Sequence, residues 1–219
     1  MKTTPPASVK ELNKRAITAY LYSKGPATKQ MLERELNLSL PTITQNLRTL
    51  EVEGLIRKGE QLESTGGRKA QTFAFVCRAK IAIGVTMRAN GLTLCAVDLG
   101  GNVISRKFKL LPYHNTDIYY QQMGVIINAF AAGVERNDDN VLGVAFSIQG
   151  IVSADGQTIT FGNIMGNTGL RLDVIAQNVK FPCIMIHDSD AAAMAELWFD
   201  HSLTDAVCVY LEMLSLIHI

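Results

Sequence analysis

The sequence predicts an α/β protein in two parts, a small helical head followed by a larger domain with a mixed sheet. Three short amphipathic helical patterns and two strand patterns fill residues 1–78. From residue 79 onward, three consecutive strand patterns give way to alternating helices and strands. Consecutive strands pair as antiparallel neighbours, whereas strands separated by helices pair in parallel, so the second part requires a mixed sheet.

The head begins with three helices whose ends are marked in the sequence. Apolar residues recur at helical spacing from Val9 to Leu21, and Gly25-Pro26 ends the pattern. Thr28 is expected to cap a second helix, and Asn37 suits the tight turn that follows it. Ser39 is expected to cap a third helix.

The third helix separates apolar from polar side chains. Ile43, Leu47 and Leu50 fall on one face. The candidate DNA-binding residues are Pro41, Gln45, Arg48 and Thr49 on the other face, with Thr42 beside them. Their hydroxyl, amide and guanidinium groups suit base edges and phosphates in a DNA major groove. An ordinary solvated helix face has the same composition, so the helix alone does not decide between the two interpretations.

A strand, a glycine-rich loop and a second strand complete the head. Leu55 to Arg57 and Thr72 to Val76 are predicted strands, and the loop between them carries Gly66-Gly67 followed by Arg68 and Lys69. This layout is typical of a winged helix. A cationic tip suits a phosphate backbone or a narrow minor groove, so Arg68 and Lys69 join the candidate DNA-binding residues. The glycines alone would also fit a plain hairpin turn.

The charge distribution supports a nucleic-acid partner. Residues 1–80 hold 14 Lys+Arg and 7 Asp+Glu, a net charge of +7, whereas the remaining residues have a net charge of −6, which together give the overall +1. Such asymmetry between the two parts of a chain is typical of a segment that binds nucleic acid. Double-stranded DNA is therefore the expected partner of the head.

The larger part begins as a run of strands. Ile81 to Met87, Leu92 to Val97 and Val103 to Leu110 are predicted strands, with turns at Asn90-Gly91 and at Gly100 to Asn102. The elements expected after them are a helix over 116–135, a strand over 141–146, a hairpin turning at Asp155-Gly156, a helix over 171–179, a strand over 183–186, a helix over 189–199 and a strand over 206–211.

A set of motifs distributed along the chain carries a family resemblance. They are Gly66 to Ala70, Ile83 to Val85 with Ala96 to Val103, Gly143 to Val152, Gly162 to Ile164, and His187 to Glu196. Together they resemble the ROK family, which groups sugar-responsive repressors with sugar kinases, over almost all of residues 9–213. The repressor branch is the more similar, because it carries a winged helix in front of the sugar-kinase fold.

The resemblance implies a domain plan and a sugar site. Residues 1–78 would be a winged helix-turn-helix DNA-binding domain, and residues 79–213 the first lobe of an actin-like, ribonuclease-H-like ROK sugar domain. Asp188 matches the aspartate with which the kinases accept the proton of a sugar hydroxyl, and Asn163 matches a sugar-site asparagine. A helix N-cap is the alternative for Asp188, and a turn residue for Asn163. His187 stands where the family usually has asparagine.

Departures from the kinase pattern predict a protein that is not an enzyme. The kinases bind ATP phosphates with an Asp-x-Gly-Gly-Thr loop, and here Thr86, Arg88 and Ala89 occupy the positions of its aspartate and glycines. Without glycines the backbone is a poor phosphate cradle, so no catalytic residue and no cofactor is expected. The family's zinc-binding cysteines are also absent, so a zinc ion would belong to a later part of such a protein.

The last residues are expected to be foreign to the protein. Leu214 to Ile219 look like translated sequencing-adapter DNA, and the resemblance ends at the same place. The alternative is a genuine strand end. Residues 214–219 are therefore expected to be a non-native tail on a truncated chain, and a sugar site with one wall missing is expected to bind no sugar measurably.

The sequence thus predicts a sugar-responsive transcriptional repressor that acts on operator DNA. Its effector would be a sugar or a sugar phosphate, and it would form a homodimer or a higher homo-oligomer. With no apolar core of a signal peptide and no span-length apolar run, the expected location is the cytoplasm. The alternatives are a ROK sugar kinase with an appended DNA-binding domain, and a DNA-binding module that interacts with another protein and senses no ligand.

Overall fold

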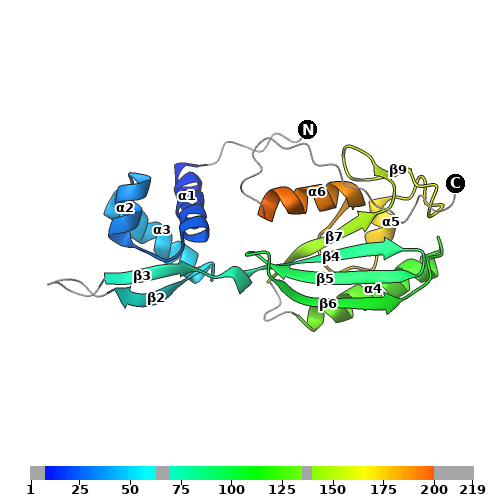
Figure 1. The fold of residues 1–219 in the computed structure, drawn as a ribbon, viewed down its shortest axis with the longest axis horizontal. Coiled ribbons are helices and arrows are strands. Elements are labelled where there is room, and N and C mark those ends of the chain that lie inside the picture. Colours follow the sequence, from blue (N-terminus) through cyan, green and yellow to red (C-terminus); the bar gives the residue numbers. More distant parts are fainter. Residues whose placement is uncertain (1–7, 63–69, 135–139, 200–219) are drawn as a thin grey trace. The chain divides into compact units, whose positions relative to one another are not determined.

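The structure of the protein is a computed structural model that describes residues 8–62, 70–134 and 140–199. The chain divides into two compact units, residues 1–79 and residues 80–219. Figure 1 shows the helices and strands of each unit.

Unit 1 contains the three predicted helices, α1 (Val9–Lys24), α2 (Lys29–Leu36) and α3 (Leu40–Val52). The N-caps of α2 and α3 are those that the sequence predicts. The Thr28 hydroxyl accepts a hydrogen bond from the Met31 N–H, and the Ser39 hydroxyl accepts one from the Thr42 N–H. Asn37 adopts the left-handed conformation, with φ 52°, at the end of α2. Each cap satisfies a backbone N–H that the helix itself leaves unpaired.

A small antiparallel sheet lies beside these helices in unit 1 (Figure 1). It contains β1 (Ala27–Thr28), β2 (Ile56–Leu62) and β3 (Ala70–Phe75), in the order β1-β3-β2. The two longer strands confirm the predicted hairpin, whereas β1 is too short for any periodic pattern to predict. The core between helices and sheet is formed by Ile17, Leu21, Leu32, Ile43, Leu47, Leu50 and Phe73.

Unit 2 is built on a mixed sheet, as the sequence predicts. Its strands are β4 (Ile81–Arg88), β5 (Gly91–Asp98), β6 (Val103–Leu110), β7 (Val141–Ile148) and β10 (Cys183–His187). The order is β10-β7-β4-β5-β6: β4, β5 and β6 pair antiparallel, and β7 pairs in parallel with both β4 and β10. The carboxyl ends of β4, β7 and β10 therefore meet at the same edge of the sheet.

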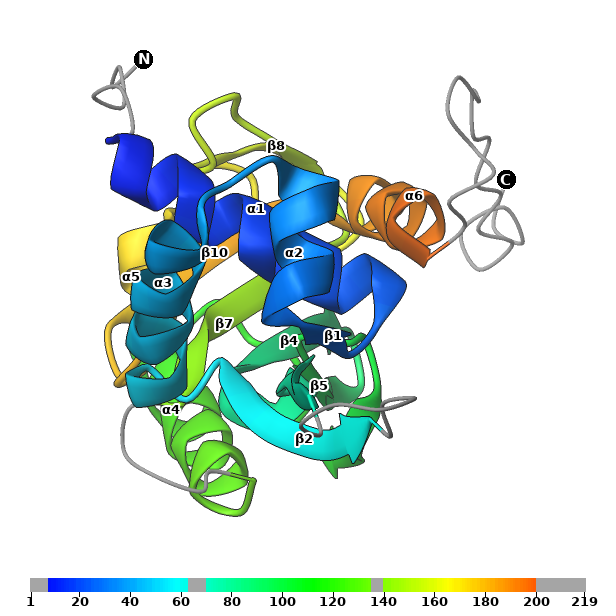
Figure 2. The same cartoon turned by 90° about the vertical axis from the view of Figure 1, so that its left-hand side faces the viewer.

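Three helices flank this sheet within the described residues, α4 (Asp117–Ala132), α5 (Leu172–Ala176) and α6 (Asp188–Phe199). Figure 2 shows α4 and α5 on one side of the sheet and α6 on the other. A small hairpin, β8 (Ile151–Val152) and β9 (Ile159–Phe161), precedes α5, and a 3-10 turn, Cys77–Ala79, joins unit 1 to unit 2. None of the helices in the described part is long and apolar enough to cross a membrane.

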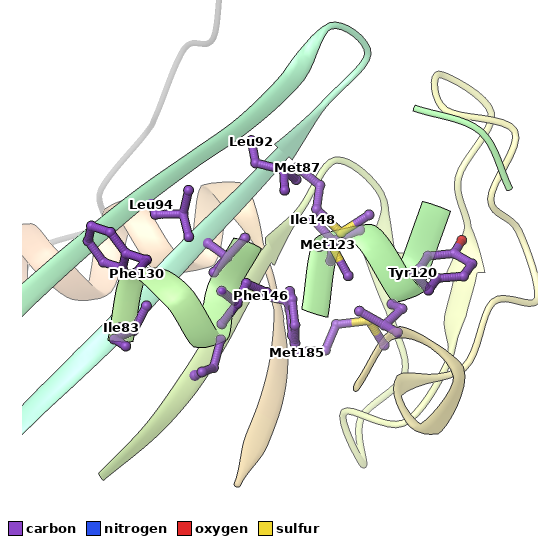
Figure 3. Close-up of a cluster of buried hydrophobic side chains, with 14 of the residues drawn as sticks. Ile83, Met87, Leu92, Leu94, Tyr120, Met123, Phe130, Phe146, Ile148 and Met185 are labelled. Carbon is purple, nitrogen blue, oxygen red and sulfur yellow. The ribbon is translucent and has the colours of Figure 1, made fainter. Parts of the chain in front are cut away.

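The core of unit 2 fills the space between the sheet and α4 (Figure 3). Alternate residues of β4 are buried on this side, from Ile81 to Met87, as expected for a strand with one covered face. Tyr120, Met123 and Phe130 of α4 pack against them. Burial of a side chain of this size contributes about 1.5–3 kcal/mol, so α4 holds the sheet in place.

One helix is shorter than its sequence predicts. The sequence predicts a helix over residues 171–179, but α5 ends at Ala176. The backbone beyond it forms hydrogen bonds with a side chain of α4 instead. The Asn128 side chain of α4 donates to the Asn178 carbonyl oxygen and accepts from the Lys180 N–H. Residues 206–211, the expected last strand, and the tail 214–219 lie outside the described residues.

Candidate functional site

The exposed face of α3 forms a shallow groove. It is lined by Leu40, Pro41, Thr44, Gln45, Arg48 and Thr49. The structure thus brings together four of the five predicted DNA-binding residues of this helix. Thr42 differs: its hydroxyl lies 2.9 Å from the Ser39 hydroxyl, and the side chain is half-buried at the helix cap. Thr44 was missed, although its spacing from Pro41 and Arg48 is that of one helix face.

Arg48 is the cationic side chain of this groove. It is exposed and takes part in no hydrogen bond or ion pair among the described residues. The hydroxyl of Thr49 already donates a hydrogen bond to the Gln45 carbonyl oxygen at 3.2 Å, so its proton is not free for another partner. A free guanidinium on an exposed helix face can bind a phosphate or a guanine edge with two parallel hydrogen bonds.

A second groove adjoins the first in unit 1. It is lined by Thr28, Lys29, Gln30, Leu40, Gln61, Ala70, Gln71 and Phe73. Leu40 lines both grooves, so the start of α2, the start of α3 and the hairpin form one continuous surface. The sequence did not single out Lys29, Gln61 or Gln71, because their contact depends on the pairing of distant segments. The predicted wing residues Arg68 and Lys69 lie outside the described residues.

A β-bulge sets the course of the hairpin that borders this groove. The pairing of β2 with β3 shifts between Lys58 and Gln61. The Gln71 side-chain amide donates to the Gly59 carbonyl oxygen at 2.7 Å, and the Thr72 hydroxyl donates to the Glu60 carbonyl oxygen. A bulge bends its strand and increases the local twist, and these two hydrogen bonds join β3 to the bulged residues of β2.

The carboxyl edge of the sheet in unit 2 holds the candidate ligand residue Asp188. It begins α6 directly after β10, and its side chain is 16% exposed. Its Oδ1 accepts a hydrogen bond from the Ser189 N–H at 2.9 Å and lies 3.3 Å from Nε2 of His187. Oδ2 has no partner within the described part of the chain. One carboxylate oxygen thus interacts with the start of the helix and with His187, and the other stays unpaired among the described residues.

Asn163 lies in the turn after β9, and its side chain is exposed. Its carbonyl oxygen accepts from the Gly166 N–H at 3.4 Å, as expected of a turn residue. No interaction joins Asn163 to Asp188 in the described part of the molecule. The buried asparagine of this loop is Asn167, which is 1% exposed and packs against Gly162.

The segment that the sequence comparison with kinases places at the phosphate loop, residues 86–90, is a tight hairpin. Arg88 pairs with Gly91 across a turn made by Ala89 and Asn90. The Ala89 carbonyl oxygen accepts from the Tyr113 N–H at 2.9 Å, which ties the turn to the segment before α4. Arg88 is exposed and makes no hydrogen bond or ion pair with the described residues.

Metal-ligating residues are not gathered in the described part of the chain. No group of three or more His, Cys, Asp or Glu side chains there could hold a metal ion. Cys77, Cys95 and Cys183 are free and partly buried. Burial raises the pKa of the Cys183 thiol to about 11, so this thiol is protonated and unreactive at neutral pH.

The comparisons with known proteins extend over both units. The chain is 26% identical over 195 residues to the DNA-binding transcriptional dual regulator NagC of Escherichia coli K12, a match that covers 89% of this chain and 48% of the relative. It is 18% identical over 191 residues to the xylose repressor of Bacillus subtilis, covering 87% of this chain and 50% of that protein. The chain thus spans about half the length of the curated relatives that it matches.

The fold has a solved counterpart. The crystal structure of a ROK family transcriptional regulator, a homologue of the Escherichia coli MLC protein, superposes with a TM-score of 0.66 at 21% identity. That match covers 89% of this chain and 50% of the other. The model of the ROK family matches residues 82–213, which is more than half of the chain. On this evidence the chain belongs to the ROK family.

Proposed function

We propose that the protein is a sugar-responsive transcriptional repressor that binds operator DNA through unit 1. The observation that carries this proposal is the groove on α3, where Gln45 and Arg48 stand exposed beside Pro41 on a helix held by its caps. Amide and guanidinium groups on one helix face read base edges, and a helix of this size fits the major groove. The relatives matched over both units are a DNA-binding transcriptional regulator and a xylose repressor.

The sugar response is assigned to unit 2. Asp188 offers a carboxylate oxygen at the carboxyl edge of the sheet, where α/β folds place their ligands. Asn163 is proposed as a second contact from the turn after β9. A sugar that prefers one arrangement of the protein shifts its population away from the DNA-binding form, by no more than that preference. We propose a homodimer on a two-fold symmetric operator, acting in the cytoplasm where the genome lies.

A sugar kinase is the alternative, and Asp188 is the observation that favours it. A carboxylate that binds a sugar hydroxyl can also accept its proton. The β4–β5 turn argues against this activity. Arg88 and Ala89 stand where the kinases have glycines, and the Ala89 carbonyl oxygen is held by the Tyr113 N–H. We therefore propose that the protein is not a kinase.

The experiment that tests this proposal measures DNA binding and its release by sugars in the full-length protein. Duplex fragments from the protein's own locus are titrated by fluorescence anisotropy, and a panel of sugars is then added to the complex. We expect nanomolar binding to a subset of fragments and release by one sugar or sugar phosphate. Equal, weak binding to every fragment would contradict the assignment as a repressor.

A further inference from the structure

We propose that the edge strand β6 is an interaction surface for an acidic, extended segment of another protein, which adds to the sheet of unit 2 as a further strand. β6 lies at one edge of the sheet (Figure 1) and, among the described residues, pairs only with β5. The backbone groups on its outer side are therefore open, and such an edge is a ready template for another strand. This inference is independent of the proposed binding of DNA and sugar.

The charge of β6 is opposite to that of the rest of unit 2. Arg106, Lys107 and Lys109 are exposed, and none of them has a carboxylate partner in the described part of the chain. Residues 81–219 contain 7 Lys+Arg and 13 Asp+Glu, so three of these seven cations lie within four consecutive residues. A cluster of unpaired cations on an otherwise acidic domain favours an acidic partner.

A groove on the α4 side of β6 holds two of these cations above an apolar floor. Its volume is about 230 Å³, and Leu94 of β5 and Phe130 of α4 (Figure 3) form part of its floor. Lys107 and Lys109 line it because they pair with Leu94 and Leu92, which are buried on this side. The Lys107 Nζ lies 5.9 Å from the centroid of the Phe130 ring, a cation–π contact that helps to position the ammonium group.

The other face of β6 is apolar toward the end of the strand. Phe108 is 53% exposed and Leu110 is 75% exposed, and both alternate with the lysines, so they face away from α4. An added strand would cover them, and its backbone would bond to the open edge. For antiparallel addition, the complementary sequence is apolar, acidic, apolar, acidic, acidic, opposite Leu110, Lys109, Phe108, Lys107 and Arg106 in that order.

A second copy of the chain and a DNA duplex match this surface less well. Pairing of two β6 strands centred on Phe108 would place Lys107 of each copy opposite Lys109 of the other, and like charges directly opposite destabilise a sheet. Lysines on an edge strand thus hinder self-association. Phosphates have no use for the exposed apolar side chains, and the net charge of −6 over residues 81–219 repels DNA. An acidic strand is the occupant that satisfies both the charges and the apolar face.

The test titrates a fluorescently labelled peptide with the core Val-Glu-Val-Glu-Glu against the full-length protein, meaning the whole reading frame to which these residues belong. Fluorescence anisotropy should show saturable binding that weakens as salt is added. The double variant Lys107→Glu with Lys109→Glu should weaken this binding by at least about 10-fold, because two attractions become repulsions. It should instead bind a peptide with the core Val-Lys-Val-Lys-Glu, in which only the two facing charges are exchanged.

Two controls separate strand addition from general attraction of charge. Lys180→Glu changes an exposed lysine that does not line the groove and should leave peptide binding intact. Two further peptides are N-methylated at alternate residues, in opposite phase. Alternate N–H groups of an antiparallel strand point to its neighbour, so one of these peptides should lose binding and the other should keep it. Thermal melting of each variant checks that it is folded.

The outcomes divide cleanly. Binding of the acidic peptide, its loss in the double variant and its recovery with the charge-exchanged peptide support the inference. Absence of binding, equal binding by the natural chain and the double variant, or equal binding of the two methylated peptides would overturn it. Self-association that the double variant abolishes, without peptide binding, would make the occupant a second copy. A loss of DNA affinity in the double variant, again without peptide binding, would assign the cations to DNA, and either result would also overturn the inference.

Discussion

Arg48 illustrates how local chemistry places a functional group in this protein. Ser39 caps α3, Ile43 and Leu47 bury its opposite face, and the guanidinium is left exposed in the groove without an internal partner. A buried polar side chain lies on the same helix: Asn46 is 3% exposed and donates to the Thr42 carbonyl oxygen at 2.8 Å. The helical pattern did not predict this asparagine as a core residue, because polarity alone assigns it to the surface.

Replacing Arg48 by alanine should weaken DNA binding by about 1–3 kcal/mol, because one bidentate contact to a base or phosphate is lost. Arg15→Ala is the matched control, because Arg15 is 68% exposed on α1 and lines neither groove. Its Nε lies 3.9 Å from Oε1 of Glu11, a long and exposed ion pair. Anisotropy titrations of the two variants on the same duplex provide the comparison. Equal losses of DNA affinity in the two variants would contradict the placement of α3 in the DNA interface.

Leu47 stabilises the packing of the same helix, α3, through its burial. It is 2% exposed, and Leu47→Ala should lower the free energy of unfolding by about 2–5 kcal/mol through lost burial and a residual cavity. Val52 is 89% exposed on α3, so Val52→Ala should change stability by less than about 0.5 kcal/mol. Urea denaturation followed by circular dichroism measures both. A small effect of Leu47→Ala would mean that the α3 core is not packed as described.

The elements show where sequence patterns succeed and where they fail. The caps at Thr28 and Ser39 and the alternation of β4 are local, so the sequence predicted them and the mixed sheet. The two-residue β1 forms because β3 pairs with it. The helix α5 ends early because the side chain of Asn128, about 50 residues earlier, forms a hydrogen bond with the backbone that follows it. Such features depend on contacts between distant segments, which one sequence does not reveal.

The bulged hairpin borders the second groove of the surface that we propose to bind DNA. Thr72→Val removes the hydroxyl that donates to the Glu60 carbonyl oxygen and keeps the side-chain shape. We expect a stability loss of about 0.5–1.5 kcal/mol together with weaker DNA binding, since the hairpin loses its fixed course.

Thr18→Val provides the control for this prediction. Its hydroxyl donates to the Lys14 carbonyl oxygen within α1, and its removal touches neither groove. Thr18→Val should lower the free energy of unfolding by no more than Thr72→Val does, and it should leave DNA affinity unchanged. If the two variants weaken DNA binding equally, the bulge does not orient the DNA-binding surface.

At the scale of the whole molecule, the chain separates a basic head from an acidic body, with net charges of +7 over residues 1–80 and −6 over the rest. The overall charge of +1 conceals this difference, and the change of sign falls at the boundary between the two compact units. Each unit has its own hydrophobic core. These observations support the proposal that the first unit binds DNA and the second binds the effector.

The full-length protein should not transfer phosphate from ATP to a sugar, because the β4–β5 turn lacks the glycines of a phosphate cradle. A coupled assay for ADP release across the sugar panel measures this. The control is Asp188→Asn, which removes the group that would accept the sugar proton. ADP release that depends on a sugar and falls in this variant would establish a kinase.

The salt dependence of DNA binding tests the central claim most directly. The equilibrium constant of the protein for duplex DNA is measured by anisotropy between low and physiological salt, for the natural chain and for Arg48→Ala. If unit 1 lies on the phosphate backbone, the logarithm of the constant should fall linearly with the logarithm of salt, with a slope of about −0.9 for each phosphate contacted. Arg48→Ala should bind more weakly at every salt concentration. Affinity that is independent of salt, and equal for the two proteins, would contradict the assignment of unit 1 as a DNA-binding domain.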